Sequence, residues 1–373
     1  MKLETRNNNF DLLRLIAAFM VAYSHFLRLL DIGEDPLLKI TGNIDTSELG
    51  VIVFFIISGY LVTKSFTYAK SRTQFLFNRV LRIFPGYLVC LLFCVFIVGA
   101  LSTTWNIYDY LTSYKTYLFF LNSYLFTLQY QLPGVFEANP RQYTVNSAIW
   151  TLCIEFLAYL MLFVMFNNKK ILKTYCVIGL TLLVVFLNII YHEERVLFAH
   201  QVDDPLGAYF LYYFNFTESL RFVLYFFIGS MFSLFKSTVT TNKYIFLLCV
   251  ISWVLSWQTQ YYDVIELLTV PYCVLFLGLT YNKNIDLFFK KVGDLSYGVY
   301  LYHSPVAQFV WYKGHLTFDT FEMVLMSIFL TLLLSAISWH LVERMALGYK
   351  SYSYSKIKNR PSQSSFESNR VNK

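Results

Sequence analysis

The feature that most constrains this chain is the recurrence of apolar runs of roughly 18 to 20 residues along its whole length. An α-helix rises about 1.5 Å per residue, so such a run crosses the ~30 Å hydrocarbon core of a bilayer. A soluble protein of 373 residues could not bury so many of them in one core. Only 14% of the residues are charged, against about 25% in an ordinary soluble domain. The sequence therefore predicts an all-α, polytopic membrane helical bundle.

Apolar runs and their polar flanks predict about ten transmembrane helices. The aromatic-rich stretch 105–132 is interrupted by Asn, Ser, Thr and Lys, which favours an interfacial or re-entrant element over a span. These elements predict one transmembrane domain over residues 1–349 and a short disordered tail over 350–373. The helices are expected near residues 11–30, 49–67, 82–101, 148–166, 171–190, 220–235, 244–260, 264–281, 295–312 and 320–342.

Basic and acidic loops alternate along the chain. Loops such as 64–79 and 169–173 are basic, whereas loops such as 31–48 and 193–204 are acidic or mixed. All basic loops lie on one side only if the number of spans is even, so the positive-inside rule predicts that both termini are cytoplasmic. The same rule accounts for the formal charge of +7 without a nucleic-acid partner. The first apolar run has no small-residue cleavage site, so we expect a permanent helix rather than a removed signal peptide.

The six cysteines all fall inside predicted spans and form no CxxC pair, which is typical of small apolar packing residues. Neither a metal site nor a tightly bound cofactor is expected. The cysteines are Cys90, Cys94, Cys153, Cys176, Cys249 and Cys273.

The first predicted helix carries Arg14 and His25, and ionisable side chains inside a bilayer are candidates for function. They are eleven residues apart, so both project from one face of the helix, about 16 Å apart along its axis. In the functional interpretation, Arg14 meets an anionic group at the cytoplasmic boundary and His25 handles protons beyond the midplane. In the alternative, Arg14 reaches lipid headgroups and His25 only bonds a neighbouring helix.

Arg79 and Arg82 are three residues apart, on one face near the expected cytoplasmic end of the third helix. Pro85 is expected to disturb the start of that helix or to kink it. Two convergent guanidiniums bind phosphate bidentately, which predicts a phosphate site. The alternative is an ordinary positively charged flank.

Glu155 lies in the fourth predicted helix, about 10 Å below the outer surface. His25, counted from the other side, reaches a similar depth, so a carboxylate–imidazole pair is possible at that level. The carboxylate would orient the imidazole and raise its basicity. The alternative is a structural role, with Glu155 bonding backbone or water.

Further residues are candidates for lining a donor site or channel. The Ser58-Gly59 step inside an apolar helix indicates close helix approach or a local break. His303 is expected nearer the cytoplasmic side, as a lining or structural group. The candidate set is Ser58, Tyr60, Asn146, Trp150, Tyr297 and His303.

Five segments, taken in order, resemble the membrane acyltransferase-3 family, whose members O-acylate bacterial surface polysaccharides, peptidoglycan and some small molecules. Arg14 and His25 match the family's basic residue followed by ten residues and a histidine. Arg79 and Arg82 match its R-x-x-R pair, and Glu155 matches the acid of its W-T-L-x-x-E block. The segments, which span about residues 9 to 345, are NFDLLRLIAAFMVAYSHF, GVIVFFIISGYL, FNRVLRIFPGY, NSAIWTLCIEF and LSYGVYLYHSPV.

The resemblance implies an O-acyltransferase of the bacterial cytoplasmic (inner) membrane. Its donor would be acyl-CoA, usually acetyl-CoA, docked at the three arginines, with His25 as general base or transient acyl carrier and Glu155 in support. Many members have an acid where this chain has Ile52, so that position contributes nothing here. Members acting on peptidoglycan often carry an added extracytoplasmic domain, whereas this chain ends in a polar tail, which favours O-antigen or exopolysaccharide.

The expected partners are membrane lipid, acyl-CoA and a glycan or lipid-linked glycan. The acceptor would enter from the outer side, where loops 102–147 and 191–219 supply aromatic residues. Other functions compatible with buried charges are a flippase for lipid-linked glycan, an acyltransferase with a small-molecule acceptor, and a membrane scaffold or sensor. The chain has no internal repeat or inverted halves that would indicate a secondary transporter.

Overall fold

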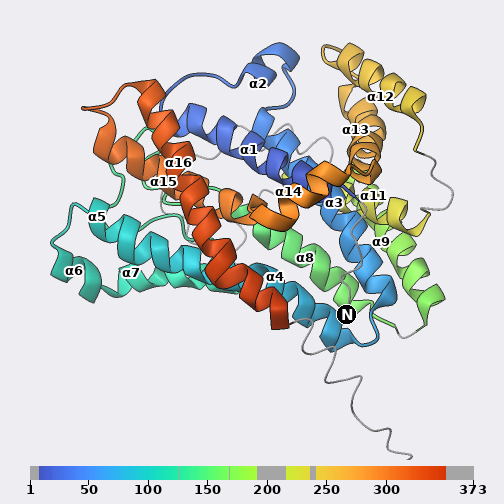
Figure 1. Ribbon diagram of the computed structural model, residues 1–373, viewed down its shortest axis with the longest axis horizontal. Helices are drawn as coiled ribbons and strands as arrows, with labels where there is room; N and C mark the ends of the chain where they lie inside the picture. The colour runs from blue at the N-terminus through green and yellow to red at the C-terminus, as the bar shows by residue number, and fades with distance from the viewer. Residues whose placement is uncertain (1–7, 126, 168, 191–215, 236–240, 350–373) are drawn as a thin grey trace, which may run out of the picture.

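The computed structural model describes residues 8–125, 127–167, 169–190, 216–235 and 241–349. Over these residues the chain is helical and contains no strand, as predicted (Figure 1). A helix occupies each of the ten expected apolar runs. They are α1 (Phe10–Leu29), α3 (Thr46–Tyr68), α4 (Arg72–Phe93), α8 (Trp150–Val164), α9 (Lys170–Ile190), α11 (Phe216–Leu234), α12 (Lys243–Ser256), α13 (Tyr262–Leu279), α15 (Ser296–Gly314) and α16 (Thr320–Ser338).

Six segments of the described chain are long and apolar enough to cross a bilayer, which identifies a membrane protein. The helices α8 and α12 are apolar but shorter, with 15 and 14 residues. The count of ten spans and the cytoplasmic side of both termini therefore stay predictions. The six segments are Phe10–Leu29, Thr46–Tyr68, Arg72–Ser102, Ile171–Ile190, Tyr262–Leu279 and Thr320–Tyr349.

Short helices lie in the described segments that connect the longer helices. The stretch 105–132 forms no spanning helix, as expected, and contains α6 (Ile107–Thr112), α7 (Tyr114–Leu118) and the 3-10 helix η2 (Phe119–Tyr124). Two further helices were not predicted, α2 (Pro36–Thr41) and the basic, amphipathic α14 (Lys283–Val292). The predicted tail over 350–373 and most of the loop 191–219 lie outside the described residues.

Helix α4 begins ten residues before the expected position, at Arg72. The Ser71 side chain accepts a hydrogen bond from the backbone N–H of Gln74 and caps this start. Pro85 lies inside the helix, which continues through the π-helix η1 (Cys94–Gly99) into α5 (Ala100–Ser102), so the expected disturbance of its start is wrong. Consequently Arg79 lies about two turns inside the helix rather than at its edge.

The helices α3 and α11 pack backbone against backbone at two glycines. A Cβ atom added at Gly59 would collide with the carbonyl of Phe226, and one added at Gly229 would collide with the carbonyl of Ile56. Ser230 Oγ donates to the carbonyl of Gly59 at 3.3 Å. Small residues let membrane helices approach in this way, which confirms the close approach predicted at the Ser58-Gly59 step.

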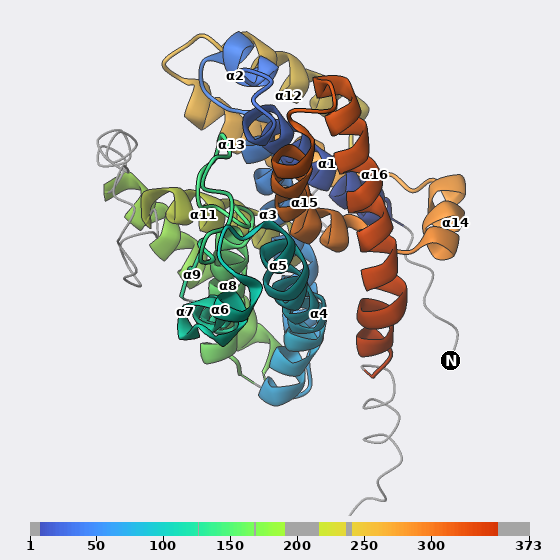
Figure 2. The same ribbon diagram turned by 90° about the vertical axis from the view of Figure 1, so that its left-hand side faces the viewer.

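The helices α1 and α15 pack against each other near the centre of the bundle, with α16 along one side of it (Figure 2). Arg14 of α1 meets Asp294, just before α15, and His25 farther along α1 meets His303 of α15. Both contacts follow the same order on the two helices, so the helices run parallel. Because both side chains of α1 reach α15, the predicted shared face of Arg14 and His25 is confirmed.

Candidate active site

A pair of histidines lies at one end of the α1–α15 contact. His25 Nδ1 is 2.8 Å from His303 Nε2, and the ring centroids are 4.9 Å apart. His303 is fully buried, whereas His25 keeps part of its surface accessible. His303 therefore lies level with His25 rather than nearer the cytoplasmic side as expected.

The hydrogen bonds of this pair select one tautomer for each ring. His303 Nδ1 is 3.1 Å from the backbone carbonyl of Val299, which only accepts, so Nδ1 carries the proton. In the neutral ring, Nε2 of His303 is then an acceptor, and His25 Nδ1 donates to it. This leaves Nε2 of His25 with a free lone pair, the atom that a general base or nucleophile needs.

The segment before α8 closes against the pair. Ser147 Oγ lies 3.4 Å from His25 Nδ1 and 3.0 Å from Ser304 Oγ. The backbone N–H of Ser147 also donates to Ser304 Oγ at 3.0 Å. Ser147 was not among the predicted site residues, because a serine in a polar loop gives no signal until the loop is placed on α15.

Two of the three predicted arginines, Arg14 and Arg82, meet at an acid that the sequence did not single out. Asp294 Oδ2 accepts from Arg82 Nη2 at 2.6 Å and lies 3.9 Å from Arg14 Nη1. Burial would raise the pKa of Asp294, but the charges of Arg82 and Arg14 outweigh it and hold that pKa at about 2 instead of 3.8. Asp294 directly precedes the LSYGVYLYHSPV block but was not among the predicted site residues.

Arg79 is the least satisfied arginine of this cluster. Its Nη2 donates to Ser65 Oγ at 3.5 Å, and its buried Nε has no partner in the described part of the chain. The charges of Arg14 and Arg82 act on it electrostatically, and its guanidinium lies 5.9 Å from the centre of the Tyr159 ring. An unfilled donor beside two other cations suits an anionic ligand such as a phosphate.

Glu155 does not pair with His25, so the predicted carboxylate–imidazole contact is wrong. Glu155 Oε1 accepts from Ser58 Oγ at 2.6 Å and from Tyr159 OH. Its charge acts on Arg79, so it belongs to the arginine side of the bundle. The partner that orients His25 is His303 instead. The prediction failed because depth alone does not tell how α8 is rotated about its axis.

The other predicted lining residues pack the bundle. Tyr60 packs against Phe10 with the rings tilted and their centroids 5.5 Å apart, and it borders a small apolar pocket between α3, α11 and α13. Asn146 Nδ2 donates to the carbonyl of Leu301 at 3.0 Å. Trp150 lies against Phe222, with ring centroids 5.8 Å apart. Their role in lining a donor site or channel stays a prediction.

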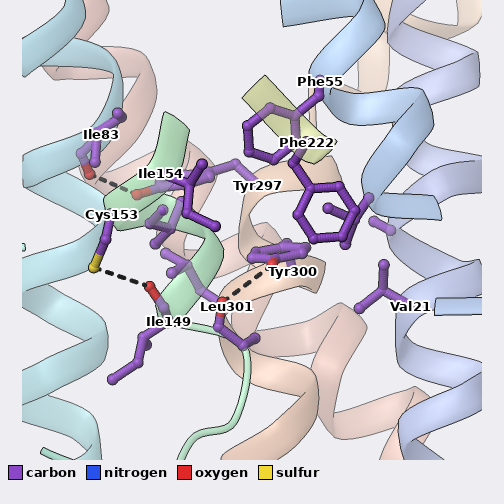
Figure 3. Close-up of a cluster of buried hydrophobic side chains, with 14 of the residues drawn as sticks. Val21, Phe55, Ile83, Ile149, Cys153, Ile154, Phe222, Tyr297, Tyr300 and Leu301 are labelled. Atoms are coloured by element: carbon purple, nitrogen blue, oxygen red, sulfur yellow. Dashed lines mark hydrogen bonds between the residues drawn. The ribbon is translucent and has the colours of Figure 1, made fainter. Parts of the chain in front are cut away.

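Tyr297 links α15 to α4 beside the arginine cluster. Its hydroxyl donates to the carbonyl of Ile83 at 2.7 Å, and its ring lies 5.8 Å from the Arg82 guanidinium. Buried side chains such as Val21, Tyr300 and Phe222 occupy the core between the two polar clusters, and Figure 3 shows them facing one another. The histidine pair joins α1 and α15, whereas the arginine cluster also includes α4, which carries Arg79 and Arg82, so the two are separate sites.

Comparison with known proteins identifies the family of the chain. Residues 7–340 match the acyltransferase domain family, acyltransferase-3. The O-acetyl transferase of Shigella phage Sf6 is 29% identical over 92% of this chain and 96% of its own length. Nodulation protein 10 of Rhizobium leguminosarum bv. viciae is 37% identical over 42% of this chain and 43% of its own. No solved structure matches the chain. The chain belongs to the acyltransferase-3 family and is a membrane O-acyltransferase.

Proposed function

We propose that this enzyme moves an acyl group, in the first instance acetyl, from cytoplasmic acyl-CoA to a hydroxyl of a surface glycan, with His25 at the reacting centre. The observation that carries the proposal is the chain His25–His303–Val299, which leaves Nε2 of His25 unprotonated on a residue that is only partly buried. Similarity to the O-acetyl transferase of Shigella phage Sf6 supports an acetyl group. The bacterial inner membrane and the glycan acceptor, such as O-antigen or exopolysaccharide, rest on the family resemblance.

The arginine cluster is the proposed donor site. Arg79 offers an unfilled Nε donor, and Arg14 and Arg82 share the carboxylate of Asp294. Acyl-CoA carries several phosphates, which two or three converging guanidiniums bind well. The thioester would then reach past the buried side chains between the two clusters, Val21 among them, over the roughly 16 Å that separates Arg14 from His25 along α1. Glu155 would act on this side, through Tyr159 and Arg79.

Two chemical routes use the same nitrogen. As a general base, His25 Nε2 takes the proton of the acceptor hydroxyl, the oxygen attacks the thioester carbon, the C–S bond breaks, and the thiolate leaves with that proton. As a carrier, Nε2 attacks the thioester carbon, the C–S bond breaks and CoA leaves as the thiolate; the acceptor hydroxyl then attacks the acyl-imidazole, the C–N bond breaks, and the hydroxyl proton passes to the thiolate. In both routes the Nδ1 proton stays on His25, and His303 holds it in place.

The test is acyl transfer by His25→Ala, with His315→Ala as a matched control. His315 is an exposed histidine stacked on Trp311, away from the pair. We expect His25→Ala to abolish O-acylation of the glycan, measured by mass spectrometry, at normal protein levels, and His315→Ala to leave it unchanged. Normal acylation by His25→Ala would refute the assignment.

A second test addresses the donor site. Changing Arg79 and Arg82 together to Ala should weaken acetyl-CoA binding, measured by titration of the purified protein. Unchanged donor affinity would remove this pair from the donor site. Glycan translocation without any change in acylation would favour the flippase alternative.

A further inference from the structure

One buried glutamine latches an outer segment onto α15. Gln308 is fully buried, and its Nε2 donates to the carbonyls of Arg141 and Thr144, both at 2.7 Å. Asn139 Nδ2 donates to Gln308 Oε1 at 2.7 Å and to its backbone carbonyl at 2.9 Å. Buried polar groups need such partners, so these four bonds hold the segment 139–147, the acceptor loop, in one position.

The same loop ends at the histidine pair. Ser147, its last residue, contacts Ser304 and His25, and Ser304 lies one turn before Gln308 on the same face of α15. The loop therefore follows α15 outward from His25. Arg141 lies along it, six residues before Ser147.

Arg141 presents an unpaired positive charge on this loop. It is exposed, and no carboxylate of the described chain lies within ion-pairing distance of it. Its charge and that of Arg28 both act on His25. Arg28 is already engaged, 3.5 Å from Asp45 and bonded to Ser24 and Ser47, so Arg141 is the unengaged one of these two described cations that act on His25.

We propose that the acceptor loop is the binding lip for the glycan and that Arg141 binds an anionic group of it, a carboxylate or a phosphate. This inference rests on the proposed function and names its acceptor class: the enzyme prefers an acidic glycan. Guanidinium matches both anions in geometry and charge. Gln308 is the positioning residue, because it fixes the backbone on either side of Arg141.

The experiment measures initial rates of acyl transfer by the full-length enzyme in lipid nanodiscs. The donor is acetyl-CoA, and the acceptor is the surface glycan of the source cell, used native, carboxyl-reduced, or dephosphorylated with hydrofluoric acid. We expect Arg141→Gln to raise the KM for native glycan about fivefold, the size of one exposed charge pair, at unchanged kcat and donor KM. Removing the anion from the glycan should raise the wild-type KM equally, with no further effect of Arg141→Gln.

The matched control is Lys313→Gln, which removes an exposed cation near the end of α15 whose partner is the Tyr312 ring. It should leave all constants unchanged. A second variant, Gln308→Glu, replaces the Nε2 donor by a carboxylate oxygen, which cannot donate to the two carbonyls. This variant should therefore release the acceptor loop. We expect it to raise the glycan KM at unchanged donor KM, with no additional loss on adding Arg141→Gln.

The possible results separate the two claims. Normal acylation with an unchanged KM in Arg141→Gln, or equal use of glycan stripped of its anions, overturns the inference alone. A source glycan with no anionic group does the same. A wild-type enzyme that acylates no form of the glycan overturns the proposed function, and this inference with it.

Discussion

Replacing His303 by Phe keeps a buried ring but removes the acceptor for the Nδ1 proton of His25. That bond is 2.8 Å long and lies in a buried setting. An unsatisfied buried donor costs about 1–3 kcal/mol, and about 1.4 kcal/mol corresponds to tenfold, so acyl transfer should slow roughly 5- to 150-fold. Loss of His25 itself should cost more, about 10²- to 10⁴-fold, because the proton-transfer group is gone.

His303→Gln provides the matched comparison. Its side-chain oxygen can accept the Nδ1 proton, so we expect it to recover part of the rate that His303→Phe loses. The assay is single-turnover acetyl transfer in nanodiscs at saturating acetyl-CoA, with thermal unfolding and donor binding measured on the same samples. Both variants should bind acetyl-CoA like wild type, because His303 lies away from the arginine cluster.

Two results would refute this reasoning. Wild-type rates in His303→Phe would show that the hydrogen bond does not orient His25. Weakened donor binding in both variants, in proportion to their lost rate, would instead place His303 in the donor site.

Three further perturbations test other parts of the structure. Val21→Trp should slow acyl transfer at unchanged donor binding, because the larger side chain obstructs the core between the arginine cluster and the histidine pair. Ile16→Trp, on the exposed side of α1, should not slow it. Equal rates in the two variants would contradict a path along α1. Gly59→Val should lower the unfolding temperature by several degrees, because overpacking costs about 1–3 kcal/mol, whereas Gly179→Val, with open space around an added Cβ, should not. Asp294→Asn should also lower the unfolding temperature. Added acetyl-CoA should raise the unfolding temperature of this variant more than that of wild type, because its phosphates would replace the lost carboxylate beside Arg14 and Arg82. An equal rise would exclude a phosphate site at these two arginines.

Helix positions were predictable because apolar run length alone determines where a chain can cross a bilayer. The early start of α4 was missed because its first turns carry Arg72, Gln74 and Arg79, which do not read as membrane-embedded. The shared face of Arg14 and His25 was predictable because it depends only on the 3.6-residue period.

The partner of His25 was not predictable. Depth counting placed Glu155 beside it and His303 elsewhere, since such counting assumes that every helix starts from one plane. Asp294 lies beside Arg14, which is already four residues inside α1. The nine residues from Asp294 to His303 then run alongside the eleven residues from Arg14 to His25. Which side chains meet across helices depends on rotation and offset, and these follow from packing of the whole bundle.

The central claim is that an acyl group supplied at the arginine cluster reaches the acceptor through His25. Its most direct test uses proteoliposomes with the protein in one orientation, radiolabelled acetyl-CoA only on the arginine side and glycan only on the other. Wild-type protein should label the glycan, and His25→Ala should not. Labelling by His25→Ala, or labelling only when donor and glycan share one side, would contradict the account.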